Sequence, residues 1–384
     1  MKIVYCMHSL YNPGGMERTM LNKIAYWKAH TDWDVVAVTT NQQGRPLFFP
    51  LPDGVKHVDL GINYVKEMDD RPLQKVISYL KKRRRHRKLL TELLMKERAD
   101  VTVSLFPSES SFIPSIADGS KKVLELHLNR YFRLQYNRTG IVGLIDRFRS
   151  WQDVRLVRRF DRFVVLTEED RGYWGTLSNI AVIPNSSVSR LHETADLTSH
   201  HLIAVGRLDY QKSFDRLLMA WAEVCATPSV GDWVLDIFGQ GEWEERLRQM
   251  IAQLGIGQHT VLHGPSTDIE REYLNSSAIL MTSHYEGLPM VLIEAMSHGL
   301  PPVAFACKCG PRDLIDDGKN GLLVEDGNIH QFAQAVVTLI TDEALRRRMS
   351  QEALKIKERY SEESVMKQWK DLFCELQDEK TTAN

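Results

Sequence analysis

Glu286 and Glu294 are two carboxylates that flank the expected start of a helix, with seven residues between them. An apolar run of strand length, residues 278–283, precedes Glu286, and Pro289 suits the first turn of a helix. The free N–H groups at a helix start attract anions, and a carboxylate accepts hydrogen bonds from two neighbouring hydroxyls. One ligand that offers a polyol, a phosphate and a second diol in order would match this stretch.

A sugar nucleotide carries its groups in that order. The spacing resembles the signature of the family 4 retaining glycosyltransferases, and the resemblance extends over residues 299–304 and 310–315. In that family the first Glu contacts the donor sugar and the second holds the nucleotide ribose, which implies these roles for Glu286 and Glu294. The competing interpretation is a buried strand–helix corner with solvated carboxylates, ended by Gly299 as a left-handed cap.

Two cations follow the first expected strand of the second half of the chain. Gly206 ends that strand, Arg207 comes next, and Lys212 lies five residues later. A glycine allows close approach of the backbone, and an arginine with a lysine can clamp a diphosphate. The pair resembles the phosphate-binding pair of the same family, which implies that Arg207 and Lys212 stabilise the leaving diphosphate. Two surface cations at a strand end are the alternative.

Two further positions in the first half have weaker signals. Gly15, in the stretch Pro13–Glu17, lies between the first strand and the first helix, where the family has a glycine loop near the donor phosphate or the acceptor. His127 follows an expected strand, where the resemblance implies contact with the donor sugar. An ordinary turn and a satisfied histidine are the alternatives. No third glycine completes a GxGxxG pattern, which disfavours a nicotinamide or flavin cofactor.

Several other residues are expected at the donor through loops and backbone groups. The segments after two strands of the second half, beginning at Gly239 and Gly264, are expected near the nucleotide, although both also fit plain turns. The complete set of expected donor-binding residues is Gly15, Gly206, Gly239, Gly264, Gly287, Leu288, Pro289, Met290 and Glu294. The expected catalytic residues are His127, Arg207, Lys212 and Glu286. Asp313 and Ser213 depart from the family pattern, which commonly has Glu and Gly or Asn there.

Composition is that of a globular protein without a membrane span. Of the 384 residues, 43% are hydrophobic and 26% are charged, and no run approaches the roughly 20 apolar residues that span a bilayer. The five cysteines are scattered, which favours a reduced, cytoplasmic location. Cys307 and Cys309 have no partner pair at a suitable spacing, so we interpret them as ordinary thiols. No metal or cofactor is expected, because the sugar nucleotide is a substrate.

Strand-like and helix-like segments alternate along the whole chain, which predicts an α/β protein. Among the expected elements are a helix over residues 15–30 and strands over residues 34–39, 101–105 and 302–305. We expect two doubly wound, Rossmann-like domains in tandem, the GT-B arrangement that the resemblance also implies, with a cleft between them. The expected limits are 1–187 for the acceptor-side domain, 188–200 for a linker and 201–360 for the nucleotide-sugar domain. Two or three helices finish the chain, and the last, within 361–384, is expected to cross back to the first domain.

The two halves carry opposite charge. Residues 1–199 contain 31 Lys and Arg against 22 Asp and Glu, and the remaining residues contain 18 against 28. The basic run Lys81–Lys88 lies in the expected helix 72–98, and Arg130, Arg133, Arg138, Arg147 and Arg149 add to the basic side. A solvated helix face is one interpretation. A peripheral contact with an anionic membrane surface is the other, whereas nucleic acid fits poorly because no aromatic platform accompanies the charge.

Together these features predict a retaining glycosyltransferase. It would move a hexose or related sugar from a nucleoside diphosphate-sugar to a hydroxyl acceptor, a lipid-linked or polysaccharide intermediate of cell-surface glycan synthesis. Two alternatives stay open: a sugar-nucleotide epimerase, which would convert its donor without an acceptor, and a non-catalytic nucleotide-sugar-binding subunit, which would bind without turnover.

Overall fold

The computed structural model describes residues 1–12, 14–64, 72–107, 109–134, 139–189 and 191–382. The expectations for Pro13 and Arg138 therefore lie outside the described residues. The chain divides into two compact units. The first contains residues 1–166, 171–183 and 366–384, and the second contains residues 167–170 and 184–365. The expected domain limits, 1–187, 188–200 and 201–360, stay a prediction.

The first unit is built on a parallel sheet in the order β3-β2-β1-β4-β5-β6-β7. Its central strands are apolar runs that are buried on both faces, as is typical of parallel sheets, whereas the two edge strands are more exposed. The strands are β1 (Lys2–Met7), β2 (Asp34–Thr39), β3 (Lys56–Asp59), β4 (Val101–Leu105), β5 (Lys121–Glu125), β6 (Arg162–Val165) and β7 (Ile180–Val182).

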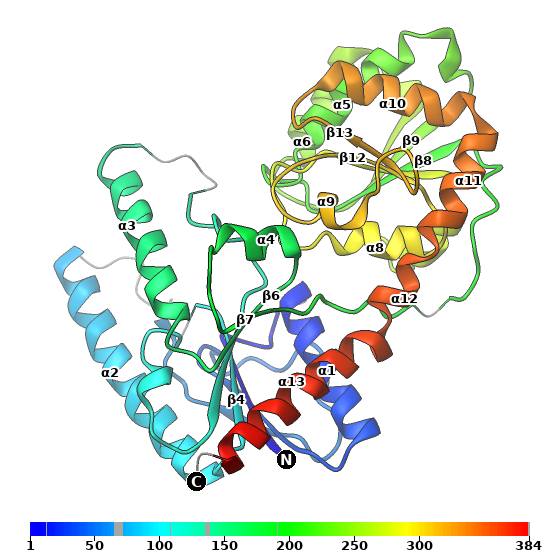
Figure 1. Ribbon diagram of the computed structural model, residues 1–384. Coiled ribbons are helices and arrows are strands. Elements are labelled where there is room, and N and C mark those ends of the chain that lie inside the picture. Colours follow the sequence, from blue (N-terminus) through cyan, green and yellow to red (C-terminus); the bar gives the residue numbers. More distant parts are fainter. Residues whose placement is uncertain (13, 65–71, 108, 135–138, 190, 383–384) are drawn as a thin grey trace. The chain divides into compact units, whose positions relative to one another are not determined.

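Helices lie on both sides of this sheet. Figure 1 shows α1 (Gly15–His30) and α13 (Glu362–Thr382) on one side of β4, and α2 (Pro72–Glu97) and α3 (Gly140–Val157) on the other. A short helix, α4 (Glu168–Tyr173), follows β6. Aromatic contacts hold α13 on the first unit, since Phe373 lies against Trp27 and Trp33 with ring centroids 6.0 and 6.2 Å apart.

The second unit repeats the architecture with the order β10-β9-β8-β11-β12-β13. Its strands are β8 (His201–Val205), β9 (Val234–Phe238), β10 (Thr260–His263), β11 (Ala278–Met281), β12 (Pro302–Phe305) and β13 (Leu322–Val324). Every pairing in this sheet is parallel. The core gathers apolar side chains of these strands and of α5 and α10, including Trp221 and Phe332.

The helices of the second unit flank its sheet. Figure 1 shows α5 (Phe214–Cys225) and α10 (Ile329–Thr341) on one side and α8 (Met290–Ser297) and α9 (Pro311–Leu314) on the other. The remaining helices are α6 (Glu244–Leu254), α7 (Ile269–Leu274), α11 (Glu343–Ala353) and α12 (Ile356–Tyr360). None of the helices in the described part of the chain is long and apolar enough to cross a bilayer.

The predicted fold class is confirmed, and so are most of the predicted elements. The helix at 15–30 and the strands at 34–39, 101–105 and 302–305 have the predicted limits. The elements β3 and α4 were missed because their sequences are mainly polar, α9 was missed because it has a single turn, and only the end of α3 was predicted. The expectation of two or three closing helices is wrong: α10, α11, α12 and α13 are separate, because helices end at Asp342, Leu354 and Ser361.

Candidate functional site

The strand order of the second unit reverses between β8 and β11. These strands are neighbours in the sheet, but the chain leaves β8 toward β9 and reaches β11 only after β10. In open α/β sheets, loops at the carboxyl ends of two such strands part and leave a crevice that binds ligands. The loop after β8 contains Arg207 and Lys212, and the loop after β11 contains Glu286. Three predicted residues therefore lie on the two loops at the reversal.

Lys212 and Glu286 form an ion pair at this place. The Lys212 Nζ donates to Glu286 Oε1 over 2.8 Å, and the side chains are only 15% and 6% exposed. The backbone positions both groups, because Lys212 N donates to Asp209 Oδ1 and Glu286 N donates to the Lys308 carbonyl. A residue predicted to bind phosphate and one predicted to bind sugar are thus in direct contact.

Glycines allow the two loops after β8 and β9 to pack backbone against backbone. A Cβ on Gly239, whose φ is +153°, would lie 1.8 Å from the Gly206 carbonyl oxygen. A Cβ on Gly206 would lie 3.1 to 3.3 Å from three carbons of the Lys212 side chain. Gly206 therefore leaves room for the lysine stem, and Gly239 leaves room for Gly206. Gly239 N also donates to the Gly264 carbonyl over 3.3 Å, which brings a third predicted residue into the cluster.

Arg207 lies at the exposed edge of the same loop. Its guanidinium is 68% exposed and contacts Asp209 Oδ2 at 3.1 Å and Gln211 Oε1 at 2.9 Å. Gln211 also reaches the loop after β11, since its Nε2 donates to the Tyr285 carbonyl and its own carbonyl accepts from His284 N. Sequence reasoning missed Gln211, although its position between the two predicted cations was a usable signal. The exposed arginine remains accessible to an anionic ligand.

A second missed residue, Arg216, fixes the end of β11. Its Nη2 donates to the carbonyls of Thr282 and Ser283, and its Nη1 contacts Asp326 at 2.9 Å. Because these carbonyls precede Glu286 by a few residues, Arg216 holds the loop that carries the carboxylate. Nothing in the local sequence separates Arg216 from an ordinary amphipathic position of α5.

The N-terminus of α8 follows the same loop. Pro289 is its N-cap residue and Met290 its first helical residue, while Leu288 is buried. A Cβ on Gly310, whose φ is +99°, would lie 2.2 Å from Pro289 Cδ, so a glycine is required beside this helix start. The helix ends as predicted, with Gly299 at a φ of +84° and Leu300 N donating to the Ala295 carbonyl.

Glu294 lies in the body of α8 and contacts a buried tyrosine. The Tyr273 hydroxyl donates to Glu294 Oε2 over 3.3 Å. Burial and the nearby Glu294 carboxylate raise the pKa of Tyr273 well above its usual value, so this hydroxyl stays a donor. The contact orients the carboxylate from the side of α7. The structure therefore places Glu286 before α8 and Glu294 within it, on the same strand–loop–helix segment.

In the first unit, His127 belongs to a buried charge network. His127 Nε2 lies 3.0 Å from Glu125 Oε1, and Lys23 Nζ donates to the same carboxylate oxygen. Burial alone would raise the pKa of Glu125, but the Lys23 and His127 charges outweigh it and hold the pKa at about 2. Lys23 also lies over the Trp369 ring, 3.9 Å from its centroid. The ring of His127 is therefore positioned by an ionised carboxylate, and its contact with a sugar stays a prediction.

Gly15 begins α1 near this network. A Cβ at Gly15 would meet no atom within 4 Å, so no packing contact explains a glycine there. Burial raises the pKa of Glu17, on the first turn of α1, and the His127 charge acts against this effect. A role for Gly15 at a donor stays a prediction.

The remaining sequence-predicted groups have structural contacts. Cys307 and Cys309 are free thiols, both buried, and burial raises the pKa of Cys307 well above its usual value. Asp313 Oδ1 accepts hydrogen bonds from the backbone N–H groups of Glu168 and Glu169, at the start of α4. Within the described residues, no group of three or more His, Cys, Asp or Glu could hold a metal ion.

Ser213, the second departure from the family pattern, has left-handed backbone geometry. Its φ and ψ are both 50°, at the N-cap of α5. Glycine and asparagine adopt this conformation most readily, which explains physically why a loop of this shape favours them. In this chain the Ser213 hydroxyl donates to Asp215 Oδ1 over 2.8 Å, and its carbonyl accepts from Thr282.

Comparisons with known proteins agree with this geometry. Residues 190–356 match the family model of the group 1 glycosyl transferases. The amylovoran biosynthesis glycosyltransferase AmsD of Erwinia amylovora is 36% identical over 223 residues, which are 56% of this chain and 62% of AmsD. The chain thus aligns with less than two thirds of that relative. An uncharacterized glycosyltransferase of Haemophilus influenzae is 29% identical over 97% of this chain and 99% of its own length.

A solved structure shows the same fold along nearly the whole chain. A mutant of S. aureus TarM, crystallised with Fondaparinux, alpha-GlcNAc-glycerol and UDP, superposes with a TM-score of 0.74. The two chains are 18% identical, and the match covers 97% of this chain and 99% of TarM. The fold of this chain is the GT-B fold.

Proposed function

We propose that this protein is a retaining glycosyltransferase that takes its sugar from a nucleoside diphosphate-sugar and transfers it to a hydroxyl of a cell-surface glycan intermediate. The observation that carries the proposal is the contact between Lys212 and Glu286 at the strand reversal of the second unit. A cation and a carboxylate that meet beside a helix start offer partners for a phosphate and for sugar hydroxyls. Glu294, farther along that helix, offers a partner for a ribose diol.

The chemistry assigned to these groups is stabilisation of charge on the leaving diphosphate. The bond between the anomeric carbon and the phosphate oxygen breaks, and a bond from the acceptor oxygen to the same carbon forms. The acceptor proton passes to the leaving phosphate oxygen on the same face, which keeps the anomeric configuration. Lys212 and Arg207 would stabilise the developing negative charge by direct contact. Glu286 would hold the sugar hydroxyls while the carbon–oxygen bonds change.

The kind of acceptor is inferred from the relatives. AmsD is named for the biosynthesis of amylovoran, and TarM was crystallised with UDP and a GlcNAc-glycerol. These names support a glycan acceptor and a uridine nucleotide as the first donor to try. No metal enters the proposed reaction, because the two cations and the helix N-terminus supply the positive charge.

A thermal-shift screen tests the donor assignment. UDP-, GDP- and ADP-sugars are added to the purified chain, because a ligand that binds only the folded state raises the melting temperature. We expect one nucleotide series to stabilise the protein and Lys212→Met to abolish most of the shift. Absence of a shift with every sugar nucleotide, or an equal shift in the variant, would refute the assignment. NMR of the product anomeric proton then tests retention, and an inverted product would contradict it.

A further inference from the structure

Helix α3 has its polar and apolar faces reversed with respect to an ordinary surface helix. Its buried positions are Asp146, Ser150, Asp153 and Val157, whereas the large apolar side chains between residues 141 and 151 point outward. Only its last turn, with Val154, Leu156 and Val157, packs apolar side chains against the core. A helix at the surface of a globular protein normally turns its apolar stripe to the core. The outward apolar residues, with their exposed fractions, are Ile141 (78%), Val142 (48%), Leu144 (65%), Ile145 (44%), Phe148 (56%) and Trp151 (49%).

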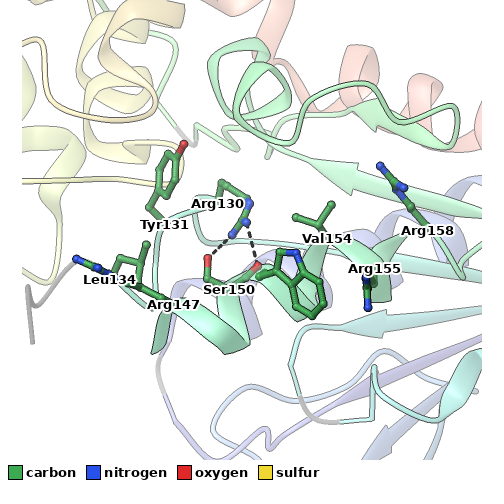
Figure 2. Close-up of a pocket in the computed structure, with 9 residues that line it drawn as sticks. Arg130, Tyr131, Leu134, Arg147, Ser150, Val154, Arg155 and Arg158 are labelled. Atoms are coloured by element: carbon green, nitrogen blue, oxygen red, sulfur yellow. Dashed lines mark hydrogen bonds between the residues drawn. The ribbon is translucent and has the colours of Figure 1, made fainter. Parts of the chain in front are cut away.

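Two arginines outside α3 bind its inward polar face through hydrogen bonds. Arg130 donates through Nη1 to Ser150 Oγ and through Nη2 to the Ser150 carbonyl, at 2.6 and 2.9 Å. Arg133 forms a fork on Asp153, with distances of 2.7 and 3.2 Å. Figure 2 shows the Arg130 contacts. These contacts fix the rotation of the helix about its axis. The opposite, apolar side therefore faces outward.

Cations flank this apolar side, and within α3 no exposed acid accompanies them. Arg147, Arg149, Arg155 and Arg158 are exposed, whereas both acids of α3, Asp146 and Asp153, are buried. Trp151 is held between Phe148, with ring centroids 5.8 Å apart, and the Arg155 guanidinium, 3.8 Å from its ring centroid. The outward surface of the helix is therefore apolar, aromatic and purely cationic.

A pocket beside this surface is also lined by positively charged side chains. It has a volume of about 440 Å³, and its lining includes Arg130, Arg147, Arg155 and Arg158 (Figure 2). Arg130 is engaged with Ser150 and Arg155 lies over Trp151, and the exposed guanidinium groups of Arg147 and Arg158 can each pair with an anionic group. An anionic headgroup beside a buried acyl region has the matching pattern of charge and apolar surface.

We propose that the outward surface of α3 is a membrane-docking surface that inserts its apolar side chains into an anionic lipid bilayer. A helix lies in the plane of a bilayer when Trp, Phe and Leu on one side enter the acyl boundary and arginines meet the headgroups. Charge complementarity selects an anionic lipid surface over a neutral one, because every exposed charge of α3 is positive. The proposal does not depend on the donor or on the transfer reaction.

The basic run of α2 supplies a second cationic surface in the same unit. Lys81, Arg84, Arg85 and Lys88 are exposed, and α2 and α3 contribute to the same apolar core on one face of the sheet. Arg83 and Arg87 are instead engaged with the hydroxyls of Ser111 and Ser115. The expected membrane contact of Lys81–Lys88 is accordingly a secondary, electrostatic one, and α3 provides the apolar insertion that a solvated run of lysines and arginines lacks.

Vesicle flotation of the full chain tests the proposal. We expect the protein to float with vesicles that contain phosphatidylglycerol and to stay in solution with phosphatidylcholine vesicles. Leu144→Ser, Phe148→Ser and Trp151→Ser together should weaken partitioning by roughly tenfold or more. Arg147→Gln with Arg155→Gln should weaken it by about fivefold for each charge removed. All these side chains are exposed, and circular dichroism with a thermal melt checks that the variants fold.

Matched control variants lie in the second unit. Met219→Ser with Val261→Ser removes exposed apolar side chains, and Arg246→Gln with Arg248→Gln removes exposed arginines. We expect flotation to be unchanged in both controls. Three outcomes would overturn the proposal: no binding to anionic vesicles, equal loss in the control variants, or unaffected binding in both α3 variants. A wild-type dimer in solution that the α3 serine variant converts to monomer would assign the surface to a second copy instead.

Discussion

Lys212 and Glu286 are 74 residues apart in sequence, yet their charged groups lie 2.8 Å apart in a place where both side chains are largely buried. Each charge therefore stabilises the other at a place where little solvent can hydrate them. An anion that enters beside them meets a lysine already fixed in position, so little side-chain entropy is lost on binding. The pair is both a structural element of the second unit and the centre of the proposed donor site.

Removal of both partners should cost less than the sum of the two single removals. Lys212→Met leaves Glu286 buried without its cation, and Glu286→Gln leaves the ammonium without its carboxylate. We expect each to lower the free energy of unfolding of the second unit by about 2–4 kcal/mol, and the double variant to lose clearly less than the sum. Urea denaturation measures this. The exposed pair Arg248 and Glu244 is the matched control, with an expected coupling of about 0.5 kcal/mol or less. Strict additivity at Lys212 and Glu286 would contradict this interpretation of the pair.

The two glutamates should separate in kinetics. Glu294→Ala removes the proposed ribose contact, so nucleotide binding should weaken with a smaller effect on kcat. Glu286→Ala removes a group placed at the sugar, so kcat should fall more than binding. Steady-state kinetics and a titration with the free nucleotide diphosphate distinguish these results. Identical kinetic changes in the two variants would refute the separate roles.

The backbone packing at Gly239 predicts a sharp difference between two glycines. In Gly239→Ala the new Cβ would lie 1.8 Å from the Gly206 carbonyl oxygen, so the loop has to move, and we expect both a lower melting temperature and weaker donor binding. Gly264 is the control, because an added Cβ there meets no atom of the chain within 4 Å. Differential scanning calorimetry compares the two. Similar stability in both alanine variants would show that the close approach is not maintained in solution.

Glu109 gives a testable pH dependence. It is fully buried, with Ser104 donating to its Oε1, and burial raises its pKa to about 7. Between the unfolded value of about 4.5 and this value, the unfolded chain releases a proton that the folded chain keeps. Stability therefore falls as pH rises through that range, by about 3 kcal/mol in total, and the loss persists at higher pH.

Glu109→Gln should remove this pH dependence. Relative to the wild type, the variant should gain stability between about pH 5 and about pH 8, because it cannot ionise. Chemical denaturation of both proteins at the two pH values measures the difference. Glu375→Gln, at an exposed position of α13, is the control. A pH-independent difference between the wild type and Glu109→Gln would contradict the assigned protonation.

The network around His127 predicts a large effect of one lysine. Lys23→Met leaves the buried Glu125 without its main cation, so we expect a loss of about 3–5 kcal/mol in the first unit. The exposed Lys370 of α13, replaced by Met, should change stability by less than about 0.5 kcal/mol. Urea denaturation at neutral pH compares the two. Equal, small effects would mean that Glu125 is protonated in the folded protein.

The sequence predicted the fold well for a physical reason. Buried parallel strands are continuous apolar runs, so segments such as Val101–Leu105 are visible without any tertiary information. Strand β3 (Lys56–Asp59) was missed because it lies at the edge of its sheet and its sequence is mainly polar. Lys23 was missed for the opposite reason: a lysine on a helix is expected at the surface, and only its distant partner Glu125 explains its burial.

The candidate site was predictable as a set of residues but not as a set of contacts. Local spacing identified Glu286, Lys212 and Gly239, because strand ends and helix starts leave recognisable residue types. The direct pairing of Lys212 with Glu286 depends on the adjacency of β8 and β11, which no local pattern encodes. The reversed faces of α3 were missed because its outward apolar residues look like an ordinary core stripe.

Calorimetric titration of the sugar nucleotide selected by the thermal-shift screen tests the central claim most directly, with wild-type protein and with Arg207→Met, Lys212→Met as the double variant. If the two cations hold the diphosphate, the wild type binds and the variant binds at least about a hundredfold more weakly, since two charge-assisted contacts are lost. Equal dissociation constants in the two proteins, with both folded, would contradict the claim that this pair of loops is the donor site.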